Sequence, residues 1–377
     1  MCVWARRTVA LLVGLVTAMD ASADWTVNLR PGATGISHDI FGLHMAILWI
    51  CVAIGVVVFG VMFYAIVAHR KSRGHKPARF HENTTVEVLW TLIPSIILVI
   101  MVVPATATLM DIYDTSGADL DIRITGYQWK WRYQYVDDDF GYFSNLVTPQ
   151  DQIHNRQTKN EHYLLEVDNP LVLPVGRKIR FLVTSNDVIH SWWVPDLGVK
   201  KDAIPGYINE TWTRIDKPGL YRGQCAELCG KNHGFMPVVV KAVPAPEYAA
   251  WVSDQKAAAE QERLLTEKDW TLEELVARGE QVYQTTCAAC HQPDGSGAPP
   301  AFPALNGSPV ATGDANGHIE VVLNGRQGTA MQAFGKQLSE VDLAAVITYE
   351  RNAWGNHTGD KVTPQDIVAY RKQHSSP

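Results

Sequence analysis

Residues 126–135 read Gly126-Tyr127-Gln128-Trp129-Lys130-Trp131-Arg132-Tyr133-Gln134-Tyr135, with an aromatic side chain at every second position. Alternation with a period of two is typical of a β-strand, so we expect one strand with an aromatic face here. Further short strands are expected at Leu164 to Val167, Lys178 to Val183, Thr211 to Ile215 and Pro237 to Val243. Short strands at this spacing predict an all-β sandwich or barrel of roughly a hundred residues, which we assign to residues 117–243.

Two apolar segments precede the sandwich. Met45 to Val67 and Val88 to Met110 contain no charged residue, and each approaches or exceeds the ~20 residues that a membrane-spanning helix needs. Within residues 24–112 we therefore expect an N-terminal tail and a hairpin of two transmembrane helices, at about 41–68 and 87–111. The second helix contains Pro94 and Pro104, and each proline removes a backbone hydrogen bond from the helix. Neighbouring helices of a partner membrane subunit can compensate for this loss.

The connection between the two apolar segments is basic. Its charged residues are Arg70, Lys71, Arg73, Lys76 and Arg79, with Glu82 as the first carboxylate. Short basic loops stay in the cytoplasm, so the hairpin directs both chain termini to the periplasm. The sequence thus predicts a protein of the bacterial inner (plasma) membrane with two transmembrane helices.

Residues 1–23 have the pattern of an export signal. Arg6 and Arg7 precede the apolar run Val9 to Ala18 and the small residues Ala21-Ser22-Ala23. A third membrane helix is the alternative, although about ten apolar residues are too few to span a bilayer. An exported N-terminus agrees with the orientation expected from the basic loop.

Length and charge limit the remaining possibilities. The chain has 377 residues, enough for two or three domains, and its formal net charge of -6 argues against nucleic acid as a partner. Residues 244–272 are rich in Ala, Glu, Gln and Lys and predict a helical linker. Residues 273–377 combine short helical patterns with Gly- and Pro-rich loops, which indicates another domain with a C-terminal tail.

Soft metal ligands gather between Cys225 and Met236. Two thiols, an imidazole and a thioether fall within twelve positions, at Cys225, Cys229, His233 and Met236. Copper prefers such ligands, and His190, at the end of a predicted strand, can add a second imidazole. Two thiolates that each bridge two metals would form a compact binuclear copper unit.

Plainer interpretations exist for the same residues. A single His in a strand, such as His190, is usually structural. Two cysteines four residues apart could form a local disulfide or, with two histidines, a zinc site. The thioether of Met236 and the position of Glu227 between the cysteines favour copper, because zinc has little use for a thioether.

The chain resembles subunit II of cytochrome c oxidase over roughly residues 25–245. The motifs that carry the resemblance are the two-helix anchor, Gly126 to Trp131, the His190 segment, Lys201-Asp202-Ala203-Ile204-Pro205-Gly206 and the segment from Cys225 to Met236. The resemblance implies a cupredoxin fold around the binuclear centre called CuA. It further implies that Cys225 and Cys229 bridge the coppers, that His190 and His233 are terminal ligands, and that Met236 binds weakly.

Three further roles follow from the same resemblance. Glu227 would bind copper through its backbone carbonyl, and its side chain would reach a magnesium ion shared with subunit I. Trp129 matches the tryptophan through which electrons arrive, and Glu87 aligns with a carboxylate near the mouth of a proton channel. A packed aromatic strand and a membrane-boundary carboxylate are the simpler alternatives for Trp129 and Glu87.

Covalent haem attachment is indicated by Cys287-Ala288-Ala289-Cys290-His291. In this C-x-x-C-H sequence both thiols add to haem vinyl groups and the His binds iron. Residues from about 273 to 356 resemble class I cytochromes c, an all-α fold, and Met331 lies in a context like their axial-Met loop. Gln332 departs from the usual Pro after that Met, so His318 stays open as an alternative ligand.

Together these features predict a multidomain membrane protein: the electron-accepting subunit of a respiratory, proton-translocating cytochrome c oxidase. The expected route runs from cytochrome c or another periplasmic donor to haem c, then CuA, then haem a and the oxygen-reducing centre of subunit I. Subunits I and III and membrane lipid are the expected neighbours. The alternatives are an electron shuttle for another terminal reductase such as nitrous oxide reductase, a quinol oxidase subunit, which would lack the cysteine pair, and a tethered cytochrome without copper.

Overall fold

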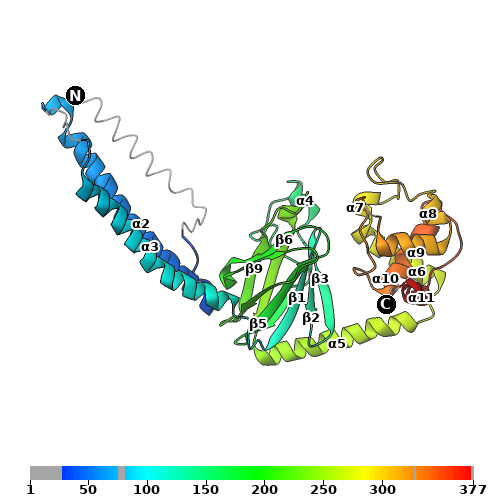
Figure 1. Cartoon of the computed structure of the whole chain (residues 1–377). Coiled ribbons are helices and arrows are strands. Elements are labelled where there is room, and N and C mark those ends of the chain that lie inside the picture. The colour runs from blue at the N-terminus through cyan, green and yellow to red at the C-terminus, as the bar shows by residue number, and fades with distance from the viewer. Residues whose placement is uncertain (1–27, 75–80, 327, 375–377) are drawn as a thin grey trace. The chain divides into compact units, whose positions relative to one another are not determined.

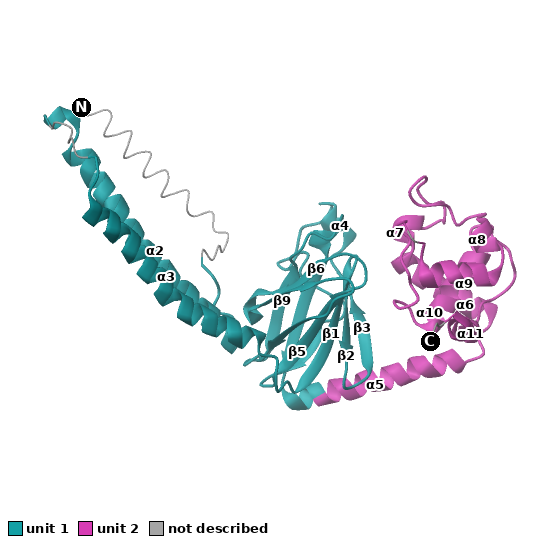
Figure 2. Ribbon diagram, in the orientation of Figure 1, with its two compact units in different colours: residues 1–248 teal, residues 249–377 magenta. Residues whose placement is uncertain are grey.

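The computed structural model describes residues 28–74, 81–326 and 328–374. The chain divides into two compact units, Met1–Tyr248 and Ala249–Pro377 (Figure 2). The predicted export signal at residues 1–23 lies outside the described residues, as do Lys76 and Arg79 of the basic loop. The predicted architecture is confirmed: two apolar helices, a β-sandwich and a helical C-terminal region.

The two apolar helices, α2 (Gly35–Ala68) and α3 (Thr84–Tyr113), are long enough to cross a membrane (Figure 1). Both begin earlier than the sequence predicted. The N-cap of α2 is Thr34, which forms a capping box with Ser37 and also donates its hydroxyl to the carbonyl of Leu197 in the sandwich. Caps therefore hold polar first turns that lie outside the uncharged segments of the two helices. Asn83 caps α3 with its side chain, which accepts the amide hydrogen of Val86.

The sandwich consists of two five-stranded sheets, ordered β3-β2-β1-β5-β8 and β4-β10-β9-β6-β7. Their strands are β1 (Leu120–Tyr127), β2 (Lys130–Tyr135), β3 (Phe140–Ser144), β4 (Leu171–Pro174), β5 (Ile179–Ser185), β6 (His190–Val194), β7 (Val199–Ala203), β8 (Asn209–Thr213), β9 (Gly219–Cys225) and β10 (Pro237–Val243). A short helix, α4 (Gln150–Ile153), lies in the connection from β3 to β4. The largest fully buried side chains include Trp131, Trp192 and Tyr133, so aromatic rings fill much of the core.

The prediction of a single aromatic strand is wrong. This segment forms a hairpin of β1 and β2, which turns at Gln128 and Trp129. The inward-facing residues have even numbers in β1, such as Ile124, and odd numbers in β2, such as Trp131. Tyr127 therefore lies on the opposite face of the sheet from Trp131, although both fit one alternating pattern. A tight turn reverses the chain without interrupting the aromatic spacing, which hid it.

The strand expected at Leu164 to Val167 is also absent from the described structure. Only Val167 pairs there, in an isolated bridge with Leu146. Leu164 has a φ of 60°, in the left-handed region, and the amide of Leu165 donates to the carbonyl of His162. The apolar residues of this segment thus belong to a turn, and apolar composition alone did not distinguish the two.

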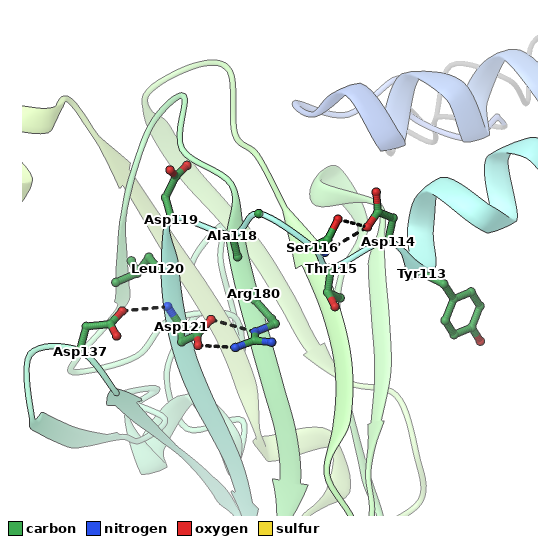
Figure 3. A pocket seen from close by; sticks show the side chains of 11 residues that line it. Tyr113, Asp114, Thr115, Ser116, Ala118, Asp119, Leu120, Asp121, Asp137 and Arg180 are labelled. Carbon is green, nitrogen blue, oxygen red and sulfur yellow. Dashed lines mark hydrogen bonds and ion pairs between the residues drawn. The ribbon is translucent and has the colours of Figure 1, made fainter.

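A polar pocket opens where α3 leads into the sandwich (Figure 3). It is lined by Tyr113 to Asp121 with Asp137 and Arg180. Arg180 forms a two-pronged ion pair with Asp121. This pocket lies at the Leu120 end of β1, whereas the soft metal ligands lie near its other end, so the two sites are separate.

The C-terminal unit is helical. Its helices are α5 (Ala245–Glu267, which begins in the first unit), α6 (Leu272–Thr286), α7 (Ala288–His291), α8 (Pro309–Thr312), α9 (Ala315–Asn324), α10 (Glu340–Asn352) and α11 (Pro364–His374). Helices α6 and α10 cross closely at Gly279, where a Cβ would lie 2.1 Å from the carbonyl oxygen of Ala345. Beside this crossing, Tyr283, Tyr349 and Trp354 pack their rings together.

Candidate metal centre

Strand pairing brings the two parts of the soft-ligand set together. His190 is the first residue of β6, and Cys225 is the last residue of β9, which pairs with β6 through Trp192 and Cys225. The amide of Ala226 donates to the carbonyl of Ser191, which holds the start of the cysteine loop against β6. The sheet therefore fixes the position of His190 relative to Cys225 and Cys229, which lie 35 and 39 residues away in the sequence.

Four of the predicted ligands converge. The ligand atoms of His190, Cys225 and Cys229 lie within 4.8 Å of one another. The two sulfur atoms are 3.8 Å apart, so the cysteines are not joined by a disulfide. Nδ1 of His233 lies 3.6 Å from the sulfur of Cys229. His190 and both cysteines are buried, so the cluster is largely shielded from water.

The two remaining predicted ligands adjoin this cluster. The carbonyl oxygen of Glu227 lies 3.3 Å from the sulfur of Cys225, while the Glu227 residue itself is exposed. Met236 is 1% exposed, and its carbonyl accepts the amide hydrogen of Cys225. The carbonyl of Glu227 thus lies beside the cluster while its side chain is exposed, which is compatible with the two predicted roles of copper binding and magnesium binding.

The electrostatics of the two thiols differ. Burial favours the protonated form of Cys225, but His190 and the backbone of Ser191 and Glu227 outweigh it and lower the pKa of Cys225. Burial and the neighbouring Cys225 raise the pKa of Cys229. Without a metal the pair therefore favours one thiolate beside one thiol, and a cation between the sulfurs would remove the penalty on the second charge.

The donor set fits a soft metal. Nδ1 of His190 is buried and makes no hydrogen bond to any described residue, whereas its Nε2 lies 2.8 Å from the carboxylate of Asp187. Burial opposes the charged imidazolium, but Asp187 and Cys225 outweigh it and raise the pKa of His190. A buried imidazole nitrogen without a partner, beside two thiols, is the arrangement that metal binding would complete.

The β1–β2 turn lies directly on this cluster. Nε1 of Trp129 and Nε2 of Gln128 both donate to the carbonyl oxygen of Cys229, at 3.1 and 2.8 Å. The sequence identified Trp129, but it missed Gln128 and Asp187. Asp187 lies in the loop before β6, three residues before His190, and this close spacing was the available signal for Asp187.

Glu87 has a local structural partner. It lies in the first turn of α3, and its carboxylate accepts the amide hydrogen of Asn83 at 3.3 Å. The residue is exposed. A capping contribution therefore accounts for its position, and a role at a proton channel stays a prediction.

The C-x-x-C-H sequence forms a compact helical turn. Cys287 is the cap residue between α6 and α7. Helix α7 contains Cys290 and His291, and the amides of both donate to the carbonyl of Cys287. Nδ1 of His291 lies 2.9 Å from the carbonyl oxygen of Pro303. A carbonyl only accepts, so Nδ1 carries the hydrogen and Nε2 retains a lone pair, which fits haem iron ligation.

The two candidates for the opposite iron ligand have different surroundings. Met331 is half-buried in an irregular segment, where its carbonyl accepts the amide hydrogen of Arg326. His318 is buried in α9, and its Nε2 lies 2.8 Å from the carboxylate of Glu350. Nδ1 of His318 is buried and has no hydrogen-bond partner among the described residues, so His318 stays the alternative ligand, and the sequence context of Met331 keeps it the preferred prediction.

Three family models match successive parts of the chain. Residues 22–107 match the transmembrane domain of cytochrome c oxidase subunit II, and residues 120–243 match its periplasmic domain. Residues 274–349 match subunit III of cbb3-type cytochrome c oxidase, a cytochrome c domain. The first two families imply CuA copper, and the third implies haem c.

Individual relatives agree. A probable cytochrome c oxidase subunit 2 of Rickettsia felis is 38% identical over 67% of this chain and 81% of its own length. The Rickettsia bellii protein of the same description is 39% identical over 67% of this chain and 94% of its own length. Among solved structures, the periplasmic domain of subunit II of cytochrome oxidase from Bradyrhizobium japonicum is 45% identical, with 38% of this chain and 98% of that chain covered and a TM-score of 0.35. The chain thus belongs to the cytochrome c oxidase subunit II family and carries a cytochrome c domain after its β-sandwich.

Proposed function

We propose that this chain is the electron-accepting subunit of a respiratory cytochrome c oxidase. Its C-terminal domain would take electrons from cytochrome c or another periplasmic donor, and its sandwich would pass them to haem a and the oxygen-reducing site of subunit I. The observation that carries the proposal is the convergence of His190, Cys225 and Cys229 within 4.8 Å in a buried cluster.

The residues of the cluster would bind paired copper in different ways. Cys225 and Cys229 would bridge, His190 and His233 would each be a terminal ligand, and Met236 and the Glu227 carbonyl would bind weakly. When bound, the copper pair supplies a one-electron carrier. The rigid sheets hold these ligands in place and exclude water, so little has to move when the charge of the centre changes.

Two residues at the edge of this cluster suit contacts with neighbours. Trp129 is half-buried and hydrogen-bonded to Cys229, which supports a role as the point where electrons arrive. The exposed side chain of Glu227 would help bind a magnesium ion at a boundary with subunit I. Glu87 would lie near the mouth of a proton channel in the assembled, proton-translocating enzyme.

The C-terminal domain would hold haem c through Cys287, Cys290 and His291, with Met331 as the second axial ligand. The haem supplies another one-electron carrier when bound. The Pro303 carbonyl orients the His291 ring, as described above. The packed Tyr283, Tyr349 and Trp354 rings stiffen the part of the core that adjoins Cys287.

The protein is membrane-anchored, and we propose the bacterial inner membrane with both termini in the periplasm. Arg70, Lys71 and Arg73 follow α2 and are exposed, which favours a cytoplasmic connection. The most apolar windows of α2 and α3 bury no residue within this chain. Lipid and the membrane helices of subunits I and III would cover these apolar surfaces.

A tethered electron shuttle for nitrous oxide reductase is the second candidate. The cytochrome c domain and the buried cysteine pair suit either enzyme. The two-helix anchor, with its match to the subunit II transmembrane domain, favours the oxidase. Oxygen consumption by membranes that contain the chain, compared with their reduction of nitrous oxide, distinguishes the two.

The direct test is electron paramagnetic resonance of the full chain, purified in detergent with its haem. We expect a signal from one unpaired electron shared by two coppers, at two coppers per haem iron. Cys225→Ser should abolish this signal and keep the haem, whereas Cys51→Ser, in the exposed surface of α2, should keep both. A chain that contains iron porphyrin but no stoichiometric copper would contradict the proposal.

A further inference from the structure

Asp187 joins two parts of the metal centre that are distant in the sequence. Its Oδ1 lies 2.8 Å from Nε2 of His190, and its Oδ2 accepts the backbone N–H of Gln128 at 2.8 Å. Its own loop is held in place because Oδ1 also accepts the amide hydrogen of Val188. The side chain is 18% exposed, against 0% for that of His190. The two oxygens of one carboxylate therefore serve His190 and the β1–β2 turn separately.

The contact with Oδ1 determines which nitrogen of His190 can bind a metal. A carboxylate accepts hydrogen bonds, so the hydrogen of the neutral ring is on Nε2. The lone pair is then on Nδ1, the buried nitrogen without a described hydrogen-bond partner. Rotation of the ring is also restricted, because Gly126 packs against it so closely that a Cβ would lie 2.7 Å from Cδ2 of His190.

The contact with Oδ2 extends this control to the cysteine loop. Gln128, whose backbone binds Asp187, donates its side-chain amide to the carbonyl of Cys229. Trp129, the next residue, donates its indole N–H to the same oxygen. A continuous series of hydrogen bonds therefore runs from His190 through Asp187 and Gln128 to Cys229.

We propose that Asp187 is a positioning residue of the metal centre: it fixes the orientation and tautomer of His190 and, at the same time, the turn that presents Trp129 to Cys229. The inference rests on the proposed function, because it assumes that the cluster holds copper. It adds a residue outside the ligand set that controls how the set is arranged.

Asp187→Asn is the sharpest test, because an amide has one accepting oxygen and one donating nitrogen. It can accept from either His190 or Gln128, but its NH₂ group then opposes an N–H at the other. We expect copper affinity of the full chain, measured by competition with a chelator, to fall about 10- to 100-fold. Asp202→Asn is the matched control, since this exposed carboxylate of β7 lies beside the residue paired with His190, and it should bind copper like the parent.

A spectroscopic readout separates positioning from general destabilisation. With ¹⁵N-labelled histidine, pulsed electron paramagnetic resonance of the loaded chain should show a changed coupling for one of two ligand histidines in Asp187→Asn. Asp187→Glu keeps the charge but moves the oxygens, so it should also change this coupling. An Asp187→Asn chain with parental affinity and couplings would overturn the inference while leaving the proposed function intact. Failure of the parent chain to bind paired copper would instead contradict the proposed function.

Discussion

The indole N–H of Trp129 donates to the carbonyl oxygen of Cys229 at 3.1 Å, which links the half-buried β1–β2 turn to a predicted bridging residue by a single hydrogen bond. Trp129→Phe keeps an aromatic ring but removes this bond. We expect electrons to reach the copper centre at least about tenfold more slowly, the rate effect of ~1.4 kcal/mol. Stopped-flow reduction of the copper absorption measures this rate.

The control for that variant is Trp212→Phe. Trp212 also donates its indole N–H to a backbone carbonyl, that of Asp111, but at the junction with α3. It loses an equivalent bond, so it should resemble Trp129→Phe in stability and the parent chain in rate. Equal rates in all three chains would leave Trp129 with a packing role only.

Gly126→Ala should displace His190 and so weaken the metal centre. The new Cβ would lie 2.7 Å from the ring of His190, which has no free space to retreat because it is fully buried. Overpacking of this kind costs roughly 1–3 kcal/mol of folding stability, and we expect weaker copper binding as well. Gly234→Ala, beside His233, adds a methyl group with nothing within 4 Å and serves as the control. Chelator competition and denaturant unfolding measure both effects.

Met331→Ala should identify the second axial ligand of the haem. If Met331 binds iron, its removal abolishes the absorption band of methionine-ligated ferric haem and lowers the reduction potential. His318→Ala should keep the band, although it leaves the buried Glu350 carboxylate without its partner and so destabilises the domain. Loss of the band in His318→Ala alone would reverse the assignment.

Asp360 predicts a pH-dependent contribution to the stability of the C-terminal domain. The buried guanidinium of Arg351 holds the pKa of Asp360 below its usual 3.8. A lowered folded pKa stabilises the native state above the unfolded value, and this contribution is lost as the pH falls through the folded value. Asp360→Asn should therefore cost about 1 kcal/mol at neutral pH, because solvent screens the half-exposed carboxylate.

The difference between Asp360→Asn and the parent chain should shrink below about pH 4, where the parental carboxylate becomes protonated. Denaturant unfolding followed by haem absorption measures it. Asp269→Asn removes an exposed carboxylate near Lys361 and should change stability little at any pH. A constant difference from neutral to acidic pH would exclude the linkage.

Electron transfer between the two domains should depend only weakly on salt. The linker keeps the haem domain at an effective concentration near ~1 mM, so long-range attraction contributes little to their encounter. Reduction of the same chain by a soluble cytochrome c provides the comparison and should slow more as salt is added. Flash-induced kinetics at increasing ionic strength test both, and a steep loss of internal transfer would count against the tether.

The sequence predicted the layers of this protein better than the path of its chain. The long uncharged segments identified α2 and α3, because a helix that crosses a bilayer is apolar along its length and can be recognised from its own sequence. Aromatic alternation predicted sheet structure correctly, but it could not distinguish one strand from a hairpin at Gln128 and Trp129. The change from even inward positions at Ile124 to odd ones at Trp131 was the usable signal for the turn.

At the metal centre, most of the candidate ligands lie close together in the sequence, whereas the contacts that arrange them join distant residues. Cys225, Cys229, His233 and Met236 lie close together in the sequence, so their chemistry could be read directly. Asp187 and Gln128 are 59 residues apart and meet only because β1 and β5 run parallel in the same sheet. The spacing of Asp187 and His190 is a local signal for their contact, but the contact of Asp187 with Gln128 could be found only in three dimensions.

Helix α5 can change in length without disturbing the folded parts on either side of it. Between Ala249 and Arg263 it buries no residue, and its charged surface includes the Arg263 pairs with Glu260 and Glu267. Inserting seven residues there would lengthen it by about 10 Å, or two turns, and would keep the same helical face on each side of the insertion. The length of the segment between the sandwich and the cytochrome c domain is thus adjustable, and evolution or an engineer can alter it by whole turns without refolding either end.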